Sequence, residues 1–204
     1  AKSPDKKLGM ECKKVNSMYS LFTYSDDQAL KFVRDNMPDY VYKAYVNLPL
    51  PVLKADLFRY IVAFTLGGFY NDADIDCFNP FSSIVDDNID FVVGVEKNLI
   101  DVDNWLGWNF PRKYQLLQWT FGSAPGHPIL ADIIDKIVAM EPRITASIGY
   151  MDKLARNLCI VEFSGPGVFT DSVLNYIAKK KAQDPFKYIY INSDYGFSDD
   201  EFYP

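Results

Sequence analysis

The hydrophobic and polar positions of the chain alternate between a helical spacing and short runs typical of strands. From Pro51 to Leu66 almost every residue is apolar, which indicates a helix that is buried on most of its sides. Pro51 suits the first turn of this helix, and Gly67 suits the left-handed position after its last turn. Ser25 is predicted to be the N-cap of an amphipathic helix over 25–36. Further helical or turn-like segments are predicted at 38–46, 127–140, 164–180 and, with a more ambiguous pattern, 145–157.

Runs of β-branched and aromatic residues predict the strands. The continuous apolar run over 90–95 is predicted to be a strand buried in the sheet, whereas the spacing of 114–124 fits a strand or a helix. The segment from Phe69 to Asp76 is predicted to be a short strand that runs into a loop. Further predicted segments are strands at 18–24 and 187–191, a frayed polar start at 1–16 and a long loop at 96–112. Because helices and strands alternate, we expect one α/β domain that spans residues 1–204.

The composition is that of a globular protein with a sizeable core. The 204 residues are 49% hydrophobic and 16% aromatic, and the formal net charge is −6. No cluster of Lys and Arg occurs, so a nucleic-acid surface is not expected, although a small phosphorylated ligand held by a metal ion is compatible with this charge. There is no signal peptide and no long apolar run. We therefore expect these residues to be soluble, with any membrane anchor lying outside them.

The cysteine and histidine residues limit the metal chemistry. Cys12, Cys77 and Cys159 form no Cys-x-x-Cys pair, so a zinc site is not expected, and they permit one disulfide with at least one free thiol. His127, the single histidine, stands beside Pro128 at a helix start and is predicted to cap or pack that helix and not to catalyse. Metal ligands would then be mainly carboxylates, which suit Mg²⁺ or Mn²⁺.

Asp72, Asp74 and Asp76 are spaced two apart, directly after the apolar helix and the pair Gly67-Gly68. Alternate residues of a strand point to one face, so these carboxylates would repel one another unless a cation lay among them. Ligands bind at strand ends in open α/β sheets. The position therefore predicts a divalent cation that bridges the acids and a phosphate-bearing ligand, with a solvated acidic loop as the alternative.

Asp56 and Arg59 are the only charged residues between Ala55 and Leu66. Their spacing of three places them on one face of the helix, and buried charges are either paired or used. Two interpretations stay open: a structural ion pair, or a pair that lines a polar pocket and hydrogen-bonds sugar hydroxyls. Lys54 lies off this face and is expected at the surface or facing a phosphate.

Two further features are compatible with ligand binding or with simple packing. The Gly-Pro-Gly segment at 165–167 opens a predicted helix, whose N-terminal amides suit an anion, and a tight turn is an equally good reading. Trp105 and Trp108 in the long loop, together with Trp119, are suited to stacking on a sugar ring, although most tryptophans are core residues.

Three stretches resemble a known family when they are taken together. They are LPLPVLKADLFRYIVAFTLGGFYNDADID, QLLQWTFGSAPGHPIL and FSGPGVFTDSVLNYI, and they occur in that order within 18–180. The chain resembles the glycosyltransferases with a D-x-D sugar-binding region, in the group typified by the initiation-specific α-1,6-mannosyltransferases. The resemblance implies a GT-A (Rossmann-like) fold, a nucleotide-sugar donor, Mn²⁺ and retention of the anomeric configuration.

The resemblance also implies roles for individual residues. Asp72 and Asp74 match the two acids of the motif. Asp74 would ligate Mn²⁺ directly, while Asp72 would act on the metal, through water, or on the ribose. Asp56 and Arg59 match an Asp and an Arg that related enzymes aim at the donor sugar, and Tyr70 matches a position near the nucleotide.

Other parts of the family pattern are matched without a role or are not matched. The segment 165–167 and Asp171 match a later Gly-Pro-Gly-x-x-Thr-Asp segment, to which the resemblance assigns no role. An opening strand of the form Ile-Pro-Lys-x-Ile-(His/Trp)-Gln and a histidine beyond the Gly-Pro-Gly segment have no counterpart. Either the ends of the domain lie outside these residues, or the site is altered.

The expected function is the transfer of mannose from GDP-mannose to a glycan hydroxyl by a retaining enzyme that depends on Mn²⁺ or Mg²⁺. The resemblance would place the full-length protein in the Golgi lumen as a type II membrane protein. The alternatives are a related hexosyltransferase with another donor or a glycosphingolipid acceptor, and a catalytically impaired carbohydrate- or metal-binding domain. A metal-dependent phosphohydrolase would need more His and Asp ligands than the chain offers.

Overall fold

A computed structural model of the chain describes residues 10–75, 77–83, 89–103, 110–181 and 189–192. Its α-helices are α1 (Met10–Val15), α2 (Asp26–Asn36), α3 (Asp39–Asn47), α4 (Pro51–Leu66), α5 (Pro128–Ser147), α6 (Lys153–Phe163) and α7 (Pro166–Lys181). Its strands are β1 (Gly68–Asn71), β2 (Phe91–Asn98), β3 (Tyr114–Ser123) and β4 (Ile189–Asn192). Two short 3₁₀ turns are η1 (Phe81–Ser83) and η3 (Ile148–Tyr150).

The described strands form one mixed sheet in the order β1-β3-β2-β4. β3 runs antiparallel to both β1 and β2, whereas β2 and β4 are parallel. β1, β2 and β4 therefore run in one direction, and their carboxyl ends face the same edge of the sheet. The mixture of helices and strands agrees with the predicted α/β class.

β3 is longer than the part of β2 that it accompanies. Val93 pairs with Phe121 and Val95 pairs with Leu116, so two steps along β2 correspond to five steps along β3. The additional residues of β3 lie between Leu116 and Phe121, where the strand does not pair with β2, and of these Thr120 pairs with Asn71 of β1. Irregularities of this kind re-aim a strand locally and are common beside functional sites.

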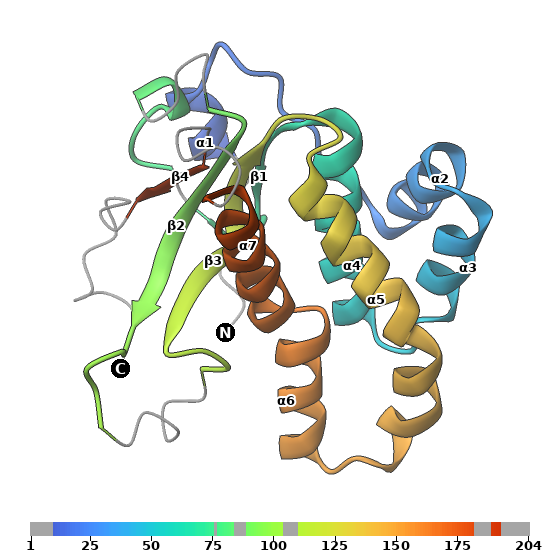
Figure 1. Cartoon of the computed structure of the whole chain (residues 1–204). Coiled ribbons are helices and arrows are strands. Elements are labelled where there is room, and N and C mark those ends of the chain that lie inside the picture. Colours follow the sequence, from blue (N-terminus) through green and yellow to red (C-terminus); the bar gives the residue numbers. More distant parts are fainter. Residues whose placement is uncertain (1–9, 76, 84–88, 104–109, 182–188, 193–204) are drawn as a thin grey trace, which may run out of the picture.

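Helices α2 to α7 pack together beside the sheet, whereas α1 lies apart from them, and the core lies between these helices and the sheet (Figure 1). α7 packs on β3, α4 contacts β1 and β3, and α5 contacts both α4 and α7. Phe121 of β3 stacks on Tyr60 of α4 and packs against Phe169 of α7, and all three side chains are fully buried. This arrangement holds α4 against the edge of the sheet that β1 forms.

Most of the predicted elements are present. Ser25 is the N-cap of α2 and forms a capping box. α4 and its C-cap Gly67 lie where the apolar run predicted them. The segment 114–124, whose pattern fitted a strand or a helix, is a strand. β2 begins as predicted but continues to Asn98, which shortens the predicted loop, and α5 continues past 140 to Ser147. The strand predicted at 187–191 corresponds to β4.

The strand predicted at 18–24 is wrong. This segment is a turn followed by irregular chain, and Met18 is 93% exposed. Its aromatic residues pack on other elements and do not pair in a sheet: Tyr19 meets Phe69 edge-on, and Tyr24 meets Phe58. Aromatic content favours a strand only where a neighbouring strand offers a partner.

The predicted frayed start also differs from the structure over its described part. Residues 1–9 lie outside the described ranges, but α1 is a short helix that is fastened to the chain after β1. Cys12 forms a disulfide with Cys77, and Asn16 accepts a hydrogen bond from the backbone N–H of Phe81 at 2.7 Å. Cys159 is the free thiol.

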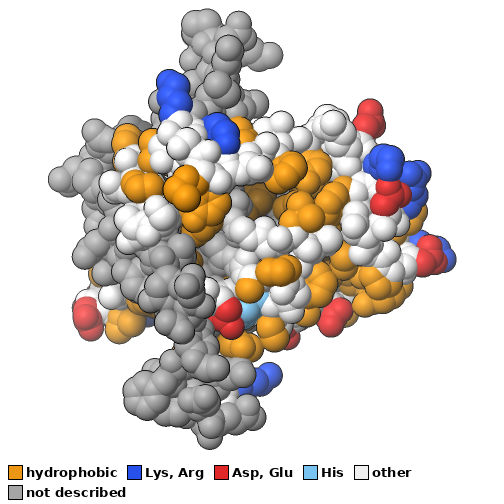
Figure 2. Space-filling model, turned by 90° about the horizontal axis from the view of Figure 1, so that it is seen from above, with side chains coloured by type: hydrophobic (Ala, Val, Ile, Leu, Met, Phe, Trp, Pro, Cys, Tyr) orange, Lys and Arg blue, Asp and Glu red, His pale blue; other side chains and the backbone are white. Residues whose placement is uncertain are grey.

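Figure 2 shows the face seen from above the view of Figure 1. Hydrophobic side chains gather in separate areas of this face, and at one end the basic and acidic side chains lie together. The fields of neighbouring opposite charges cancel at a distance, so this end of the face presents no broad field of one sign. Within the described residues, none of the helices has the length and apolar character needed to cross a bilayer.

Candidate functional site

The turn between α4 and β1 brings two motif segments face to face. Gly67 has φ +68°, and a Cβ placed there would lie 2.7 Å from Cδ of Pro125, so only glycine fits this reversal of the chain. β1 then runs back beside α4. Tyr70 and Asp72 consequently lie beside the charged residues of the helix.

Arg59 is the centre of the resulting cluster. Its Nη2 atom lies 3.0 Å from Oδ1 of Asp56 and 3.4 Å from Oδ1 of Asp72. Its Nη1 atom donates to the backbone carbonyl of Gln118 in β3 at 3.3 Å. The side chains of Arg59 and Asp56 are 8% and 3% exposed, while that of Asp72 is 30% exposed. The cluster therefore runs from the protein interior towards solvent, with Asp72 at its outer end.

Tyr70 supports the outer end of this row. Its hydroxyl donates to Oδ1 of Asp72 at 2.7 Å, and the Arg59 guanidinium lies 5.4 Å from the centre of its ring. Both described contacts of the Asp72 side chain use Oδ1. Oδ2 of Asp72 is thus left for solvent or a ligand.

Burial sets the electrostatics of the cluster. Burial raises the pKa of Asp56 to about 6, although Arg59 and the Ser164 hydroxyl act in the opposite direction. Burial also acts to lower the pKa of Arg59, but Asp56 and the neighbouring groups more than offset it, so that pKa lies above its ordinary value. The pKa of Tyr70 is raised, chiefly by burial, so its hydroxyl stays protonated and remains a donor.

One donor of this cluster has no protein partner. Nε of Arg59 is buried and makes no hydrogen bond within the described part of the chain. Such a group is rare in protein interiors and requires an explanation, for which a bound water, ion or ligand is one. It leaves the arginine with a hydrogen-bonding capacity that its neighbours do not use.

Asp74 is placed differently from Asp72. The backbone N–H of Asp72 still donates to the carbonyl of Trp119 at 2.9 Å, and the chain then turns, with Ile75 N–H donating to the carbonyl of Asp72 at 3.2 Å. Asp74 lies exposed in this turn. The prediction that three acids share one strand face is therefore wrong for the described pair, because β1 ends at Asn71; Asp76 lies outside the described residues.

The described residues fit a hard cation only in partnership with a ligand. Among them, no group of three or more His, Cys, Asp or Glu side chains is gathered as a metal site. Two carboxylates are available: Asp72 at the outer end of the cluster and the exposed Asp74 two residues further along the chain. Mg²⁺ and ions like it are typically bound by one or two carboxylates together with substrate phosphates. Two acids therefore suit such an ion only where the phosphates of a ligand complete its coordination.

The other predicted residues lie outside this cluster. His127 caps α5, where its Nδ1 accepts from the backbone N–H of Ile129 at 3.2 Å, so its predicted capping role is confirmed. Lys54 donates to the carbonyl of Val46 at 3.0 Å. Trp119 lies in β3 and donates from its indole to Glu96 at 3.3 Å, whereas Trp105 and Trp108 lie outside the described ranges.

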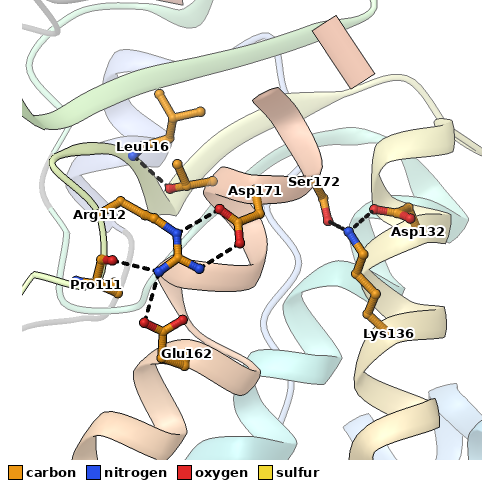
Figure 3. A network of polar contacts seen from close by, with 9 residues as sticks. Pro111, Arg112, Leu116, Asp132, Lys136, Glu162, Asp171 and Ser172 are labelled. Atoms are coloured by element: carbon orange, nitrogen blue, oxygen red, sulfur yellow. Dashed lines mark hydrogen bonds and ion pairs between the residues drawn. The ribbon is translucent and has the colours of Figure 1, made fainter. Parts of the chain in front are cut away.

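The Gly-Pro-Gly segment joins α6 to α7 in a tight packing arrangement. A Cβ at Gly165 would lie 2.8 Å from the carbonyl oxygen of Val161, and one at Gly167 would lie 2.9 Å from the Glu162 carboxylate. These contacts favour the packing interpretation of the two glycines over the anion site. Asp171 binds Arg112 through two hydrogen bonds of 2.7 and 2.6 Å, and Figure 3 shows that Arg112 also reaches Glu162.

Three residues of the site were not predicted from the sequence. Gln118 supplies its carbonyl to Arg59, and Tyr60 donates towards both Oε1 of Gln118 at 2.6 Å and the carbonyl of Ser164 at 2.9 Å. The Ser164 hydroxyl donates to Oδ2 of Asp56 at 2.6 Å. The only signal in the sequence was that Ser164 directly precedes the matched Gly-Pro-Gly segment.

Comparison with known proteins bears on the family of the chain. The model of the family described as a glycosyltransferase sugar-binding region containing a DXD motif matches residues 5–90, which include α4, β1 and both Asp72 and Asp74. Residues 5–90 thus belong to that family, and the resemblance expected from the sequence is confirmed.

Curated relatives extend the likeness beyond this region. The chain is 33% identical to an initiation-specific α-1,6-mannosyltransferase of Schizosaccharomyces pombe over 169 residues, which are 78% of the chain and 41% of the relative. It is 32% identical to the protein of the same name from Candida albicans over 176 residues, 79% of the chain and 45% of the relative. A putative glycosyltransferase, HOC1, of Saccharomyces cerevisiae is 28% identical over 143 residues, 67% of the chain and 35% of the relative.

The matches cover only part of each relative's length. The chain spans less than half the length of the curated relatives that it matches. No solved structure matches the chain.

Proposed function

We propose that the chain is the donor-binding part of a metal-dependent, retaining glycosyltransferase that transfers mannose from GDP-mannose to a glycan hydroxyl. The observation that carries the proposal is the row formed by the buried residues Asp56 and Arg59 and the partly exposed Asp72, which is the first acid of the motif. A charged row enclosed by apolar packing is costly unless it serves a ligand or an ion pair. The named relatives support mannose as the transferred sugar.

The proposed work of α4 is to bind and orient the donor sugar. A carboxylate such as Asp56 accepts hydrogen bonds from sugar hydroxyls, and the fork of Arg59 donates to hydroxyl or phosphate oxygens. Because Asp56 holds one side of the Arg59 guanidinium and Gln118 holds the other, the fork is oriented before a ligand arrives. Such preorganisation lowers the barrier through positioning.

The proposed metal ligands are Asp74 and Asp72. When bound, Mn²⁺ or Mg²⁺ would neutralise the charge that develops on the leaving diphosphate. Tyr70 holds Oδ1 of Asp72, so Oδ2 is the atom available to the ion, to a bridging water or to the ribose. The exposed turn lets Asp74 approach from the solvent side.

Three further statements belong to this proposal. The fold would be a variant of the GT-A architecture, the acceptor would be a glycan with α-1,6 linkage as in the named relatives, and the full-length protein would act in the Golgi lumen. A related hexosyltransferase with another donor or a glycosphingolipid acceptor is the nearest rival. A carbohydrate- or metal-binding domain without activity is favoured by one observation: the described residues bring only two carboxylates to the motif.

Thermal unfolding with ligands tests the donor assignment. GDP-mannose with Mn²⁺ should raise the melting temperature, because a ligand that binds only the folded state stabilises it. UDP-glucose and UDP-galactose with Mn²⁺ should raise it less. A larger shift with either UDP-sugar would reject mannose as the transferred sugar, and no shift with any nucleotide sugar would favour the inactive domain.

A further inference from the structure

Ser164 stands where two matched segments of the chain meet. It follows the last residue of α6 and is fully buried, and it precedes the Gly-Pro-Gly segment that starts α7. Its neighbours in space are residues of α4, which is 108 positions away in sequence at Asp56. The contact therefore joins the family's later segment, which has no assigned role, to the cluster on α4.

Ser164 makes two contacts with α4, one turn of the helix apart. Its hydroxyl lies 2.6 Å from Oδ2 of Asp56, and its carbonyl accepts from the Tyr60 hydroxyl at 2.9 Å. The hydroxyl also lies 3.4 Å from the carbonyl of Ile160. A serine hydroxyl has one proton, and the shorter contact to a charged acceptor is the stronger one, so the proton points at Asp56.

These contacts fix the orientation of the Asp56 carboxylate. Oδ1 faces Arg59 at 3.0 Å and Oδ2 faces Ser164 at 2.6 Å, so both oxygens of the carboxylate are engaged. With Asp56 held in this way, Nη2 of Arg59 stays between Asp56 and Asp72. The Gln118 side chain also donates to Asp56. Removal of the hydroxyl would therefore take away the shortest of the contacts that orient the carboxylate and weaken its hold in this position.

The glycines of the next segment determine where Ser164 lies. A Cβ at Gly165 would come within 2.9 Å of Cα of Val161, and one at Gly167 would come within 3.0 Å of Cα of Glu162. Glycine at both positions allows α7 to start directly against the last turn of α6. The turn therefore places Ser164 against α4 and not away from it.

We infer that Ser164 is a positioning residue of the donor-sugar site, which orients Asp56 and, through Asp56, the guanidinium of Arg59. The Gly-Pro-Gly segment then has a role in the site without touching the ligand: it supports the hydroxyl that holds the sugar-facing pair. The inference rests on the proposed function, because the donor sugar is the ligand that Asp56 and Arg59 would face.

A matched pair of serines provides the test. Ser172 in α7 is 1% exposed, and its hydroxyl accepts from Nζ of Lys136 at 2.9 Å (Figure 3). It also hydrogen-bonds Asp132. Ser164→Ala and Ser172→Ala thus remove the same group from similar polar surroundings. Ser164→Cys is a further variant that keeps the volume but offers only a weak donor.

The measurement is isothermal titration of each variant with GDP-mannose and, separately, with GDP, both with Mn²⁺ present. Ser164→Ala should weaken GDP-mannose binding about tenfold and leave GDP binding within about twofold, because Asp56 would face the sugar and not the nucleotide. Ser164→Cys should fall between wild type and Ser164→Ala. Ser172→Ala should bind both ligands as wild type does.

The possible outcomes separate the two proposals. Equal weakening of GDP and GDP-mannose by Ser164→Ala would show a general structural loss and overturn the inference, as would unchanged affinity for both. If Ser164→Ala does not fold, Ser164→Cys decides: wild-type affinity for GDP-mannose overturns the inference, and selective weakening supports it. A wild-type chain that binds GDP-mannose no better than GDP would instead overturn the proposed sugar contacts of Asp56 and Arg59, and this inference with them.

Discussion

Arg59 and Asp72 come from different elements, yet Nη2 of Arg59 lies 3.4 Å from Oδ1 of Asp72. The same nitrogen lies 3.0 Å from Asp56, while Nη1 reaches the carbonyl of Gln118. One planar fork thus links α4, the end of β1 and β3. The ion pair anticipated between Asp56 and Arg59 exists, and it is part of a larger row that includes the first acid of the motif.

Arg59→Lys tests whether this fork is used for more than packing. Lysine keeps the charge but carries its three donors on one nitrogen, so it cannot reproduce the separate contacts of the two Arg59 nitrogens with Asp56 and Asp72 and with Gln118. We expect GDP-mannose affinity to fall by at least about tenfold, with a smaller relative loss in stability. Calorimetric titration and thermal unfolding of the same preparations measure the two effects.

Arg112→Lys is the matched control for this prediction. Arg112 lies outside the cluster, and its replacement by lysine also removes a bidentate contact, in this case with Asp171. It should lose stability while keeping wild-type affinity for the donor. Equal donor affinity in Arg59→Lys and Arg112→Lys would mean that the Arg59 cluster is only structural.

Asp56→Asn should separate stability from binding. Burial raises the pKa of Asp56 from 3.8 to about 6, so the folded state holds its proton more tightly than the unfolded state. Protonation of Asp56 therefore adds roughly 3 kcal/mol to the free energy of unfolding at low pH. This contribution is present in full below about pH 4 and is lost as the pH rises through 6. The Asn side chain resembles the neutral acid at every pH. The variant should therefore be as stable as wild type, or more stable, at pH 7, and the advantage should vanish near pH 4.

Urea denaturation of wild type and Asp56→Asn across pH 4 to 7.5 measures this difference. The same variant should lose GDP-mannose binding at pH 7, because the carboxylate acceptor is gone. A loss of several kcal/mol at pH 7 would instead show that the ionised pair with Arg59 is net stabilising, and the pKa of Asp56 would then lie near or below its ordinary value.

Asp74→Asn tests the proposed metal ligand. Asp74 is exposed, so loss of its charge should leave the fold intact. Affinity for Mn²⁺ in the presence of GDP should fall by at least about tenfold, because the described residues near the turn offer only Asp72 in its place. Calorimetric Mn²⁺ titration is the measurement.

Asp135 is an exposed acid of α5, so Asp135→Asn changes the net charge equally and should have no effect on Mn²⁺ affinity. Asp76→Asn should have little effect. Unchanged affinity in Asp74→Asn would remove the metal assignment.

The disulfide between Cys12 and Cys77 should contribute stability. It closes a segment with a sequence separation of 65, for which the loss of entropy in the unfolded chain gives about 4 kcal/mol. The double substitution Cys12→Ser/Cys77→Ser should lower the free energy of unfolding by that amount and abolish its sensitivity to reductant. Cys159→Ser, at the free thiol, should change neither. A wild-type protein that unfolds identically with and without reductant would contradict the prediction.

The sequence predicted the parts of the site that depend on neighbours along the chain. The isolation of Asp56 and Arg59 in an apolar helix indicated a buried pair, and the glycines after that helix indicated the turn that leads to Asp72. Those features are local, because helix periodicity and backbone permissiveness are properties of a few consecutive residues.

The parts that the sequence did not predict depend on contacts between distant segments. Ser164 and Gln118 are ordinary polar residues until packing brings them beside α4. The strand predicted at 18–24 is wrong because tertiary contacts also decide its structure. Its residues suit a strand, but Tyr19 packs against aromatic rings and does not pair with a strand. The termination of β1 at Asn71, which separates Asp74 from Asp72, is likewise set by where β3 stops pairing with it.

Two contacts of the site depend on the number of residues in β3 and not on their side chains. The contacts of Gln118 with Arg59 and of Trp119 with Asp72 both run through main-chain carbonyls. Every amino acid supplies that carbonyl, so these two contacts do not depend on which side chains occupy the positions. They depend on how many residues separate Leu116 from Phe121. A deletion of one residue there would turn the following carbonyls away from α4, whereas many substitutions would leave them in place. In this stretch the number of residues, and not their identity, determines whether the two carbonyls reach the site.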